Sequence, residues 1–323
     1  MTDSPVDRDG VDVRSGTVMA RLARPRTAER TRIAVIADPH LSTRAEGTSK
    51  LFEETVTHVE NAVADINGRD ADLTLCVGDI TKDGERWNFD AFDEVVADLE
   101  TPFRSIPGNH DVPKEGYDHE NLPVSEFVDR YTPGELPFHE TVGGVDLVGL
   151  NTAGSEAFLA DSHDGLVTDA QLEWLRETLP ETETPVVAAH HNLRAMSDQL
   201  YAHRDAVEPD MHIPPELRNA EAFREVLTDH EVPLLLTGHL HMPSAAVVGP
   251  TRELMAPTTC SFPQGYLLVD VGPEGTEVRF VSVADHDLMR KGFSERAGDS
   301  VTASGLTAMA ATRLAQFPLV EER

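Results

Sequence analysis

Short apolar runs alternate with longer amphipathic segments through most of this chain. The short runs are rich in β-branched residues and predict buried strands at 31–37, 71–77, 103–106, 145–151, 185–189 and 232–236. The amphipathic segments predict helices at 49–67, 89–99, 124–131, 168–179 and 219–230. The helix at 168–179 opens with a Thr-x-x-Gln capping box. Strands and helices that alternate in this order predict an α/β fold built from βαβ units.

The pattern changes after residue 244. Four further runs predict consecutive antiparallel strands separated by turns, at 245–248, 253–256, 265–271 and 276–283. Near the end, Leu306, Ala310, Leu314 and Phe317 form one helical stripe. We expect this stripe to dock on the body of the protein rather than to form a dimer contact.

The same pattern predicts one main domain over residues 31–290. Residues 1–30 are rich in Asp and Arg without apolar periodicity and are expected to form a loosely held arm. Residues 291–323 are expected to form a C-terminal extension with a short helix. Residues 112–141 look irregular apart from the helix at 124–131, and residues 192–218 show no clear period, which indicates a lid-like or flexible segment.

The charge balance is strongly acidic, with 57 Asp and Glu against 27 Lys and Arg and a formal net charge of −30. The acids are spread through every segment, as on the surface of a halophilic protein, where salt screens their mutual repulsion. Nucleic acid is disfavoured as a partner, because its binding requires basic patches that the sequence lacks.

Composition also bears on compartment and redox state. No apolar run is long enough for a membrane span, and the N-terminus lacks a signal-like apolar segment, so we expect a cytoplasmic protein without membrane contact. Cys76 and Cys260 lie in apolar sequence, which favours buried free thiols over a disulfide or a thiolate metal site. The oligomeric state stays open, a homodimer included.

Polar clusters follow five of the predicted strands. These clusters are DPH at 38–40, GD at 78–79, GNHD at 108–111, HH at 190–191 and GHLH at 238–241. In open α/β sheets, ligands bind outside the carboxyl ends of the strands. The sequence therefore directs all five clusters to one crevice.

The chemistry of these clusters points to metal ions. Carboxylate, imidazole and amide oxygen without thiolate suit Mn, Fe, Co, Ni or Zn. One residue separates the ligands in DPH and in GHLH, which would place both side chains on the same side of an extended backbone. Seven such ligands are too many for one ion and suit two divalent transition metal ions.

The order DxH, GD, GNHD, H, GHxH resembles the calcineurin-like metallophosphoesterase superfamily over residues 31–283. The stretches GLVTDAQLEWLRETL (165–179) and PTTCSFPQGYLLVDV (257–271) are similar to its cyclic-nucleotide phosphodiesterase branch. The resemblance implies a four-layer α/β/β/α sandwich of two mixed sheets. It also implies that Asp38, His40 and His241 hold one metal, that Asn109, His190 and His239 hold the other, and that Asp79 bridges them.

In such a site two cations lower the pKa of a shared water and hold a phosphate oxygen in line for attack. Asn109 and His110 would face the substrate, and His110 would neutralise developing charge or protonate the leaving oxygen. Asp111 either orients the His110 ring or caps the next turn. Arg194 is either a phosphate clamp or a solvated surface residue. His191 is expected to be structural rather than a ligand.

The expected activity is hydrolysis of small phosphodiesters, with cyclic nucleotides as candidate substrates. The motifs leave a phosphomonoesterase or a pyrophosphate-cleaving enzyme open. A DNA exonuclease of the same fold is a further alternative, against which the acidic surface counts. The alternative that is not an enzyme is a catalytically silent protein-binding scaffold, although such a protein would be expected to have lost metal ligands.

Overall fold

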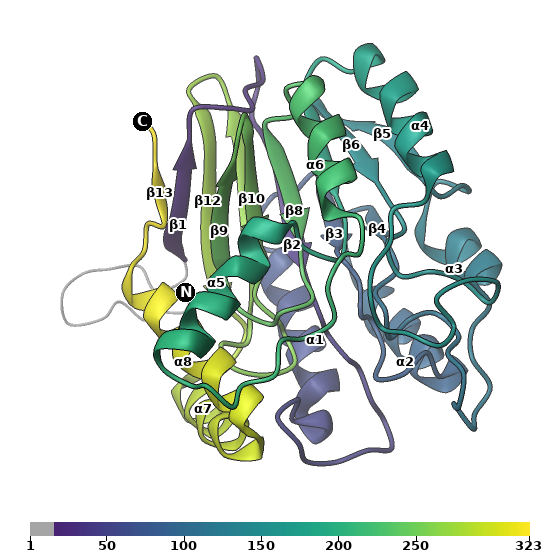
Figure 1. Cartoon of the computed structure of the whole chain (residues 1–323), viewed down its shortest axis with the longest axis vertical. Helices are drawn as coiled ribbons and strands as arrows, with labels where there is room; N and C mark the ends of the chain where they lie inside the picture. Colours follow the sequence, from purple (N-terminus) through teal and green to yellow (C-terminus); the bar gives the residue numbers. More distant parts are fainter. Residues whose placement is uncertain (1–15) are drawn as a thin grey trace.

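The computed structural model describes residues 16–323, which form two β-sheets packed face to face (Figure 1). The first sheet has seven strands, in the spatial order β13 (Val320–Glu321), β1 (Thr17–Leu22), β12 (Gly275–Ser282), β11 (Gly265–Gly272), β2 (Thr31–Ile36), β3 (Leu73–Cys76) and β4 (Phe103–Ser105). The second has six, in the order β5 (Phe138–Val142), β6 (Val145–Gly149), β7 (Pro185–Ala188), β8 (Leu234–Thr237), β10 (Thr251–Met255) and β9 (Ser244–Val248).

Both sheets combine parallel and antiparallel pairs. In the first, β2, β3 and β4 are parallel, whereas β11 runs antiparallel to β2 and to β12. In the second, β6, β7, β8 and β10 are parallel, and β5 and β9 pair antiparallel at the two edges. The parallel strands place their carboxyl ends along one edge of each sheet, where the polar clusters begin.

The main hydrophobic core lies between the two sheets. It takes side chains from both, among them Ile33, Val35, Leu75, Leu147, Val186, Leu236, Leu254 and Leu267. These side chains are almost completely buried. Burial of each such aliphatic side chain contributes about 1.5–3 kcal/mol, so this layer is the main stabilising element.

Helices cover the outer face of each sheet (Figure 1). On the first sheet these elements are the 3₁₀ helix η2 (Phe52–Glu54), α1 (Thr55–Ile66), α2 (Arg86–Val96) and α3 (Val124–Tyr131). On the second they are α4 (Asp169–Thr178), η3 (Leu179–Glu181) and α6 (Ala220–Asp229). The Thr168 side chain caps α4 by accepting from the Gln171 backbone N–H, as the capping box predicts. The predicted sandwich of two mixed sheets with outer helices is therefore confirmed.

The predicted N-terminal arm is wrong for Thr17–Leu22. This segment is strand β1, which pairs antiparallel with β12 and buries Met19 and Leu22 completely. Its partners in β12 lie more than 250 residues away in sequence, so the local sequence pattern could not predict this pairing. The first 15 residues of the predicted arm lie outside the part of the chain that the structure describes.

Two further strand predictions need correction. Residues 138–142, expected to be irregular, form the edge strand β5. The expected antiparallel run after residue 244 is two hairpins in different sheets, since β9 and β10 belong to the second sheet and β11 and β12 to the first. A local alternation of apolar residues predicts a strand but does not say which sheet it joins.

The segment 192–218 contains the helix α5 (Arg194–Ala206), contrary to the interpretation as a segment without period. Met196 and Leu200, one helical turn apart, are fully buried in a cluster that also contains Met309 of the C-terminal region. Helix α5 buries few apolar side chains, so its sequence shows no clear helical period.

The C-terminal region forms two helices, α7 (His286–Asp299) and α8 (Val301–Ala315). Helix α7 packs against α8, and α8 lies beside α5 (Figure 1). Helix α7 begins before the predicted boundary at residue 290. Leu306 and Ala310 of α8 are buried against the body, so the predicted docking of this stripe is confirmed. No helix within residues 16–323 is long and apolar enough to cross a bilayer.

Candidate metal centre

Loops that follow β2, β3, β4, β7 and β8 bring the five polar clusters together. Backbone hydrogen bonds join the first two loops: Asp38 N–H donates to Gly78 O (3.0 Å) and His40 N–H to Asp79 O (2.9 Å). The third approaches so closely that a Cβ atom at Gly108 would collide with the Asp79 carboxylate. Only glycine allows this contact, which explains its place in the GNHD motif.

Most of the predicted metal ligands have a left-handed backbone. The residues with positive φ are Asp38 (49°), His40 (42°), Asp79 (57°), His239 (77°) and His241 (55°). The expectation that DPH and GHLH are extended is therefore wrong. Such conformations cost of order 1–3 kcal/mol each and persist only where the surrounding structure holds them. Here they turn the side chains of alternate residues into one cluster.

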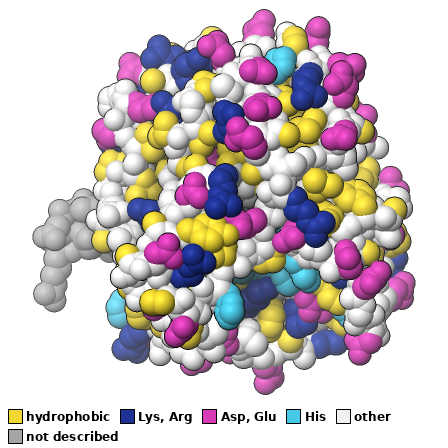
Figure 2. All heavy atoms as spheres, in the orientation of Figure 1, with side chains coloured by type: hydrophobic (Ala, Val, Ile, Leu, Met, Phe, Trp, Pro, Cys, Tyr) yellow, Lys and Arg dark blue, Asp and Glu magenta, His cyan; other side chains and the backbone are white. Residues whose placement is uncertain are grey.

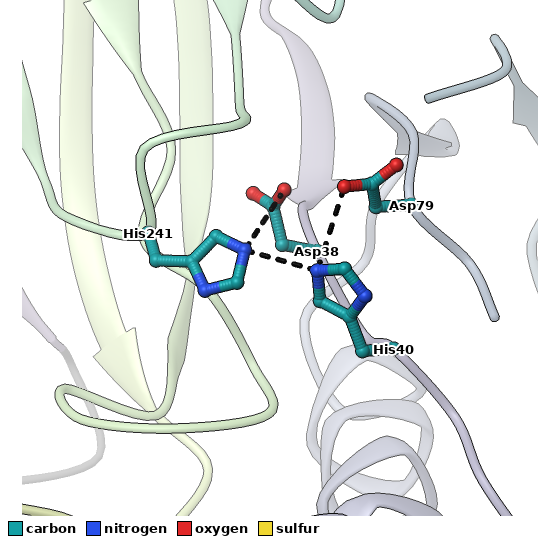
Figure 3. Close-up of side chains that lie close together, drawn as sticks. All are labelled: Asp38, His40, Asp79 and His241. Carbon is teal, nitrogen blue, oxygen red and sulfur yellow. Dashed lines mark hydrogen bonds and ion pairs between the residues drawn. The ribbon is translucent and has the colours of Figure 1, made fainter. Parts of the chain in front are cut away.

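The first group of candidate ligands comprises Asp38, His40, Asp79 and His241, whose ligand atoms all lie within 4.8 Å of one another (Figure 3). The Nε2 atoms of His40 and His241 are 3.0 Å apart, and His241 Nε2 is 3.5 Å from Asp38 Oδ1. Asp38 is fully buried and also accepts from the His239 backbone N–H. Two imidazoles that face each other with two carboxylates form a donor set suited to a transition metal ion.

The second group comprises Asp79, His190 and His239, again with ligand atoms within 4.8 Å of one another. The Asn109 Oδ1 atom lies 3.1 Å from His190 Nε2 and completes it. Asp79 Oδ2 is 3.4 Å from His40 Nε2 in the first group and 3.4 Å from His190 Nε2 in the second. This carboxylate oxygen is therefore equally distant from a histidine nitrogen of each group.

Hydrogen bonds to backbone carbonyls orient two of the histidine rings. His190 Nδ1 lies 2.8 Å from Val77 O, and His239 Nε2 lies 2.7 Å from Pro215 O. Each of these nitrogens must carry the proton, because a carbonyl oxygen only accepts. The opposite nitrogen of each ring is then free to bind a metal, the usual second contact of a histidine ligand.

The electrostatics of the site favour cations. Burial alone would raise the pKa of Asp79, but His190, His110 and His40 hold it well below its usual range. Burial would lower the pKa of His190, but the charges of Asp79 and Asp38 and the hydrogen bond to Asp79 raise it to about 9. A buried site that stabilises an imidazolium in this way also favours a metal cation in its place.

His110 is oriented by Asp83, which the sequence interpretation missed. His110 Nδ1 is 2.9 Å from Asp83 Oδ1. Asp111, for which the sequence left ring orientation and turn capping open, accepts from the backbone N–H groups of Thr81 (3.1 Å) and Gly108 (2.9 Å) and so caps the turn. Burial and the charge of Asp79 raise the pKa of Asp111 to about 7.

Two other histidines surround the ligands. His163, to which the sequence assigned no role, accepts from Asn109 Nδ2 at 3.0 Å and so directs Asn109 Oδ1 toward the second group. Its ring centre lies 5.0 Å from that of His110. His191 contacts Thr152 Oγ1 through Nδ1 (2.8 Å) and His163 O through Nε2 (3.1 Å), in agreement with the structural role predicted for it.

A cavity of about 380 Å³ opens onto both groups. Its polar wall includes Asp79, Asn109, His110, His163, His239 and His241, and its other walls include Lys50, Pro214, Pro215, Leu240, Arg296 and Leu306. Figure 2 shows histidines beside a hollow in the lower half of this face and acidic side chains scattered around it. The cavity therefore joins a metal-binding end to an apolar wall.

Arg194 does not line this cavity. Its side chain is 59% exposed, pairs with Asp198 (2.9 Å) and Glu216 (3.5 Å), and lines a separate cavity of about 430 Å³ with Tyr201. Among the two alternatives that the sequence left open, these contacts favour a surface residue over a phosphate clamp.

The C-terminal region contributes Arg296 of α7, which is 2% exposed. Its guanidinium donates to the backbone carbonyls of His241 (2.6 Å) and Phe262. Burial lowers the pKa of Arg296 to about 10. This side chain ties α7 to the loop that carries the ligand His241, so the C-terminal helices take part in shaping the site.

Replacement of Arg296 by methionine is expected to lower the free energy of unfolding by about 2–5 kcal/mol, because two buried carbonyls lose their charged donor. Urea unfolding measures this change. Arg290→Met on the same helix is the matched control, since Arg290 is 73% exposed and pairs with the exposed Asp287. Equal, small effects of the two substitutions would show that Arg296 does not anchor the loop.

The residues present fit two metal ions, since each group offers only oxygen and imidazole donors at ligand spacing. Two such groups that share one carboxylate form a dinuclear centre of the kind found in metal-dependent hydrolases. The family model for calcineurin-like phosphoesterases matches residues 31–243, and this chain belongs to that family.

Known relatives agree with this assignment. The chain is 26% identical over 242 residues to the 3',5'-cyclic adenosine monophosphate phosphodiesterase CpdA of Pseudomonas aeruginosa, covering 73% of this chain and 79% of the relative. It is 28% identical over 239 residues to CpdA of Escherichia coli K12, covering 72% and 77%. A dimetal phosphatase from Danio rerio shares the fold, with a TM-score of 0.60 at 14% identity over 79% of this chain and 97% of that one.

Proposed function

We propose that this protein is a phosphodiesterase that hydrolyses small phosphodiesters, cyclic nucleotides among them, with two divalent transition metal ions. The observation that carries the proposal is the position of Asp79 Oδ2, 3.4 Å from a histidine nitrogen of each candidate metal group. The names of the relatives from Pseudomonas aeruginosa and Escherichia coli support the substrate class.

In this proposal Asp38, His40 and His241 would hold one ion, Asn109, His190 and His239 would hold the other, and Asp79 would be shared between them. The chemistry that such ions would supply is an acidified water as nucleophile and polarisation of a phosphoryl oxygen. The carboxylates of Asp38 and Asp79 offset part of the metal charge, which retains the ions without excluding an anionic substrate.

His110 is the proposed proton donor to the leaving oxygen. It lines the cavity beside Asn109, and its Nδ1 hydrogen bond to Asp83 leaves Nε2 as the nitrogen available to the substrate. Asp83 is negatively charged at neutral pH: burial would raise its pKa, but hydrogen bonds from His110 and Lys82 lower it. A carboxylate in this position fixes the orientation of the His110 ring toward the cavity.

The apolar wall of the cavity bears on substrate size. Pro214, Pro215, Leu240 and Leu306 line the same cavity as the candidate metal ligands. Apolar walls with a few polar groups at one end are typical of sites for small molecules. A leaving group that contains a sugar and a base would contact this wall, whereas a long polyanion would meet a surface with a net charge of −30.

A panel of four substrates tests the proposal: a cyclic nucleotide, a bis-aryl phosphate, an aryl monophosphate and single-stranded DNA, each with Mn²⁺ in molar salt. We expect hydrolysis of the two small diesters and its loss on chelation. A preference for the monoester would favour a phosphomonoesterase, and cleavage of DNA would favour an exonuclease. Bound metal without hydrolysis of any substrate would favour a binding scaffold.

A further inference from the structure

One lysine of this acidic protein has an unusual environment. All of its lysines fall within residues 16–323, and three of them contact carboxylates or backbone carbonyls: Lys82 pairs with Asp83, Lys114 donates to the carbonyls of Ala153 and Leu159, and Lys291 pairs with Glu53 and Glu54. Lys50 has no carboxylate within 4 Å in this part of the chain. Its Nζ lies 3.1 Å from His40 Nδ1.

This contact conflicts with metal binding by His40. The Nε2 atom of His40 faces Asp79 and His241 and is the atom placed for a metal. A neutral imidazole that binds a metal through Nε2 carries its proton on Nδ1, so Nδ1 then donates. The lysine ammonium also only donates. His190 and His239 show the usual arrangement of a histidine ligand. In each, the ring nitrogen that does not face the metal group lies against a backbone carbonyl oxygen, which accepts its proton.

When His40 holds a metal, the Lys50 ammonium must therefore find another acceptor. Lys50 is half-buried and lines the same cavity as Asp79, Asn109 and His110. It lies on a short turn between Thr48 and Leu51, and its four-carbon stem can swing while the turn stays in place. The cavity interior, where the substrate phosphoryl group is expected, is open to it.

We propose that Lys50 binds an anionic oxygen of the substrate phosphoryl group beside the metal ions. This inference rests on the proposed function and adds a residue to it. Lysine is an effective phosphate ligand because its ammonium acts as a compact point charge with three donors. In a chain with 57 acidic residues, a lysine without an acidic partner at the mouth of the metal groups is placed to attract an anion.

The test compares Lys50→Met with the unaltered protein, both loaded with Mn²⁺. A hydrogen bond to a charged group corresponds to a change of roughly 10- to 100-fold, so KM for the preferred diester should rise by about that factor, with kcat changed far less. The dissociation constant of inorganic phosphate, measured by calorimetry, should rise in parallel. Bound metal, measured by mass spectrometry, should stay at two ions. Lys50→Arg should recover part of the phosphate affinity.

Lys291→Met is the matched control, since Lys291 also contacts acceptors but lies outside the cavity. Unchanged phosphate affinity in Lys50→Met would overturn the inference. The proposed function would still hold in that case, provided that the unaltered protein hydrolyses the diester. Loss of bound metal in Lys50→Met would also overturn the inference, because it would show that Lys50 positions His40 instead of binding the substrate. If the unaltered protein hydrolyses no substrate, the proposed function fails, and the phosphate measurement still decides whether Lys50 binds anions.

Discussion

Replacement of Asp79 by asparagine is expected to abolish most phosphodiesterase activity, by at least ~10³-fold in kcat/KM. The Asp79 Oδ2 atom is equally placed for both metal groups, and its charge favours cations there. Asparagine keeps the size of the side chain but removes the charge and one of the two oxygens. Two metal ions contribute several kcal/mol of transition-state stabilisation, and each ~1.4 kcal/mol corresponds to a factor of ten.

Metal analysis separates this effect from misfolding. Asp79→Asn should bind fewer than two ions per chain, and excess Mn²⁺ should restore little activity. Asp146→Asn is the matched control, because Asp146 is also a buried carboxylate that accepts backbone N–H bonds, from Glu183 and Thr184. It lies near the amino end of β6, whereas the candidate metal ligands follow the carboxyl ends of strands. Full activity of Asp79→Asn, with two bound ions, would exclude the shared-carboxylate arrangement.

Replacement of His110 by glutamine is expected to lower kcat by roughly 10²- to 10⁴-fold while both metal ions stay bound. His110 lines the cavity but belongs to neither ligand group, so its loss should affect proton transfer rather than metal affinity. Asp83→Asn should give a smaller loss, of about 10- to 100-fold, because Asp83 acts only through the orientation of the His110 ring.

The identity of the leaving group provides the decisive measurement for His110. A general acid matters most for a poor leaving group, so His110→Gln should slow hydrolysis of a cyclic nucleotide far more than hydrolysis of a bis-nitrophenyl phosphate. His139→Gln is the control, since His139 forms a similar pair with Asp146 (3.0 Å) away from the cavity. An equal loss for both leaving groups would indicate that His110 binds the substrate without donating a proton.

Much of the fold could be predicted because its elements are defined by short-range patterns. The helix at 124–131 and the strands that precede the five polar clusters depend on residues within a few positions of each other. Two of the misassigned elements, β1 and α5, depend on distant partners. Strand β1 lies between β12 and β13, so both of its partners come from near the other end of the chain. The buried residues of α5 pack in one cluster with residues of α8.

The candidate site divides along the same line. Its ligand types and their order along the chain are local features, and the structure brings Asp38, His40, Asp79, Asn109, His190, His239 and His241 together. For His110 the sequence offered Asp111, its neighbour, as the candidate ring-orienting residue, with a turn cap as the alternative role of Asp111, and the structure shows the turn cap. The fold instead places Asp83, 27 positions earlier in the chain, against the ring.

The amino-acid sequence by itself determined which strands end in carboxylates, imidazoles and an amide, and thereby the class of chemistry available to this protein. Only the tertiary structure decided which acid orients His110, that Arg296 anchors the loop of His241, and that Lys50 faces the metal groups. Those contacts join residues 27, 55 and 10 positions apart in the sequence. They follow from the packing of the two sheets and their helices, for which no neighbouring residues carry a signal.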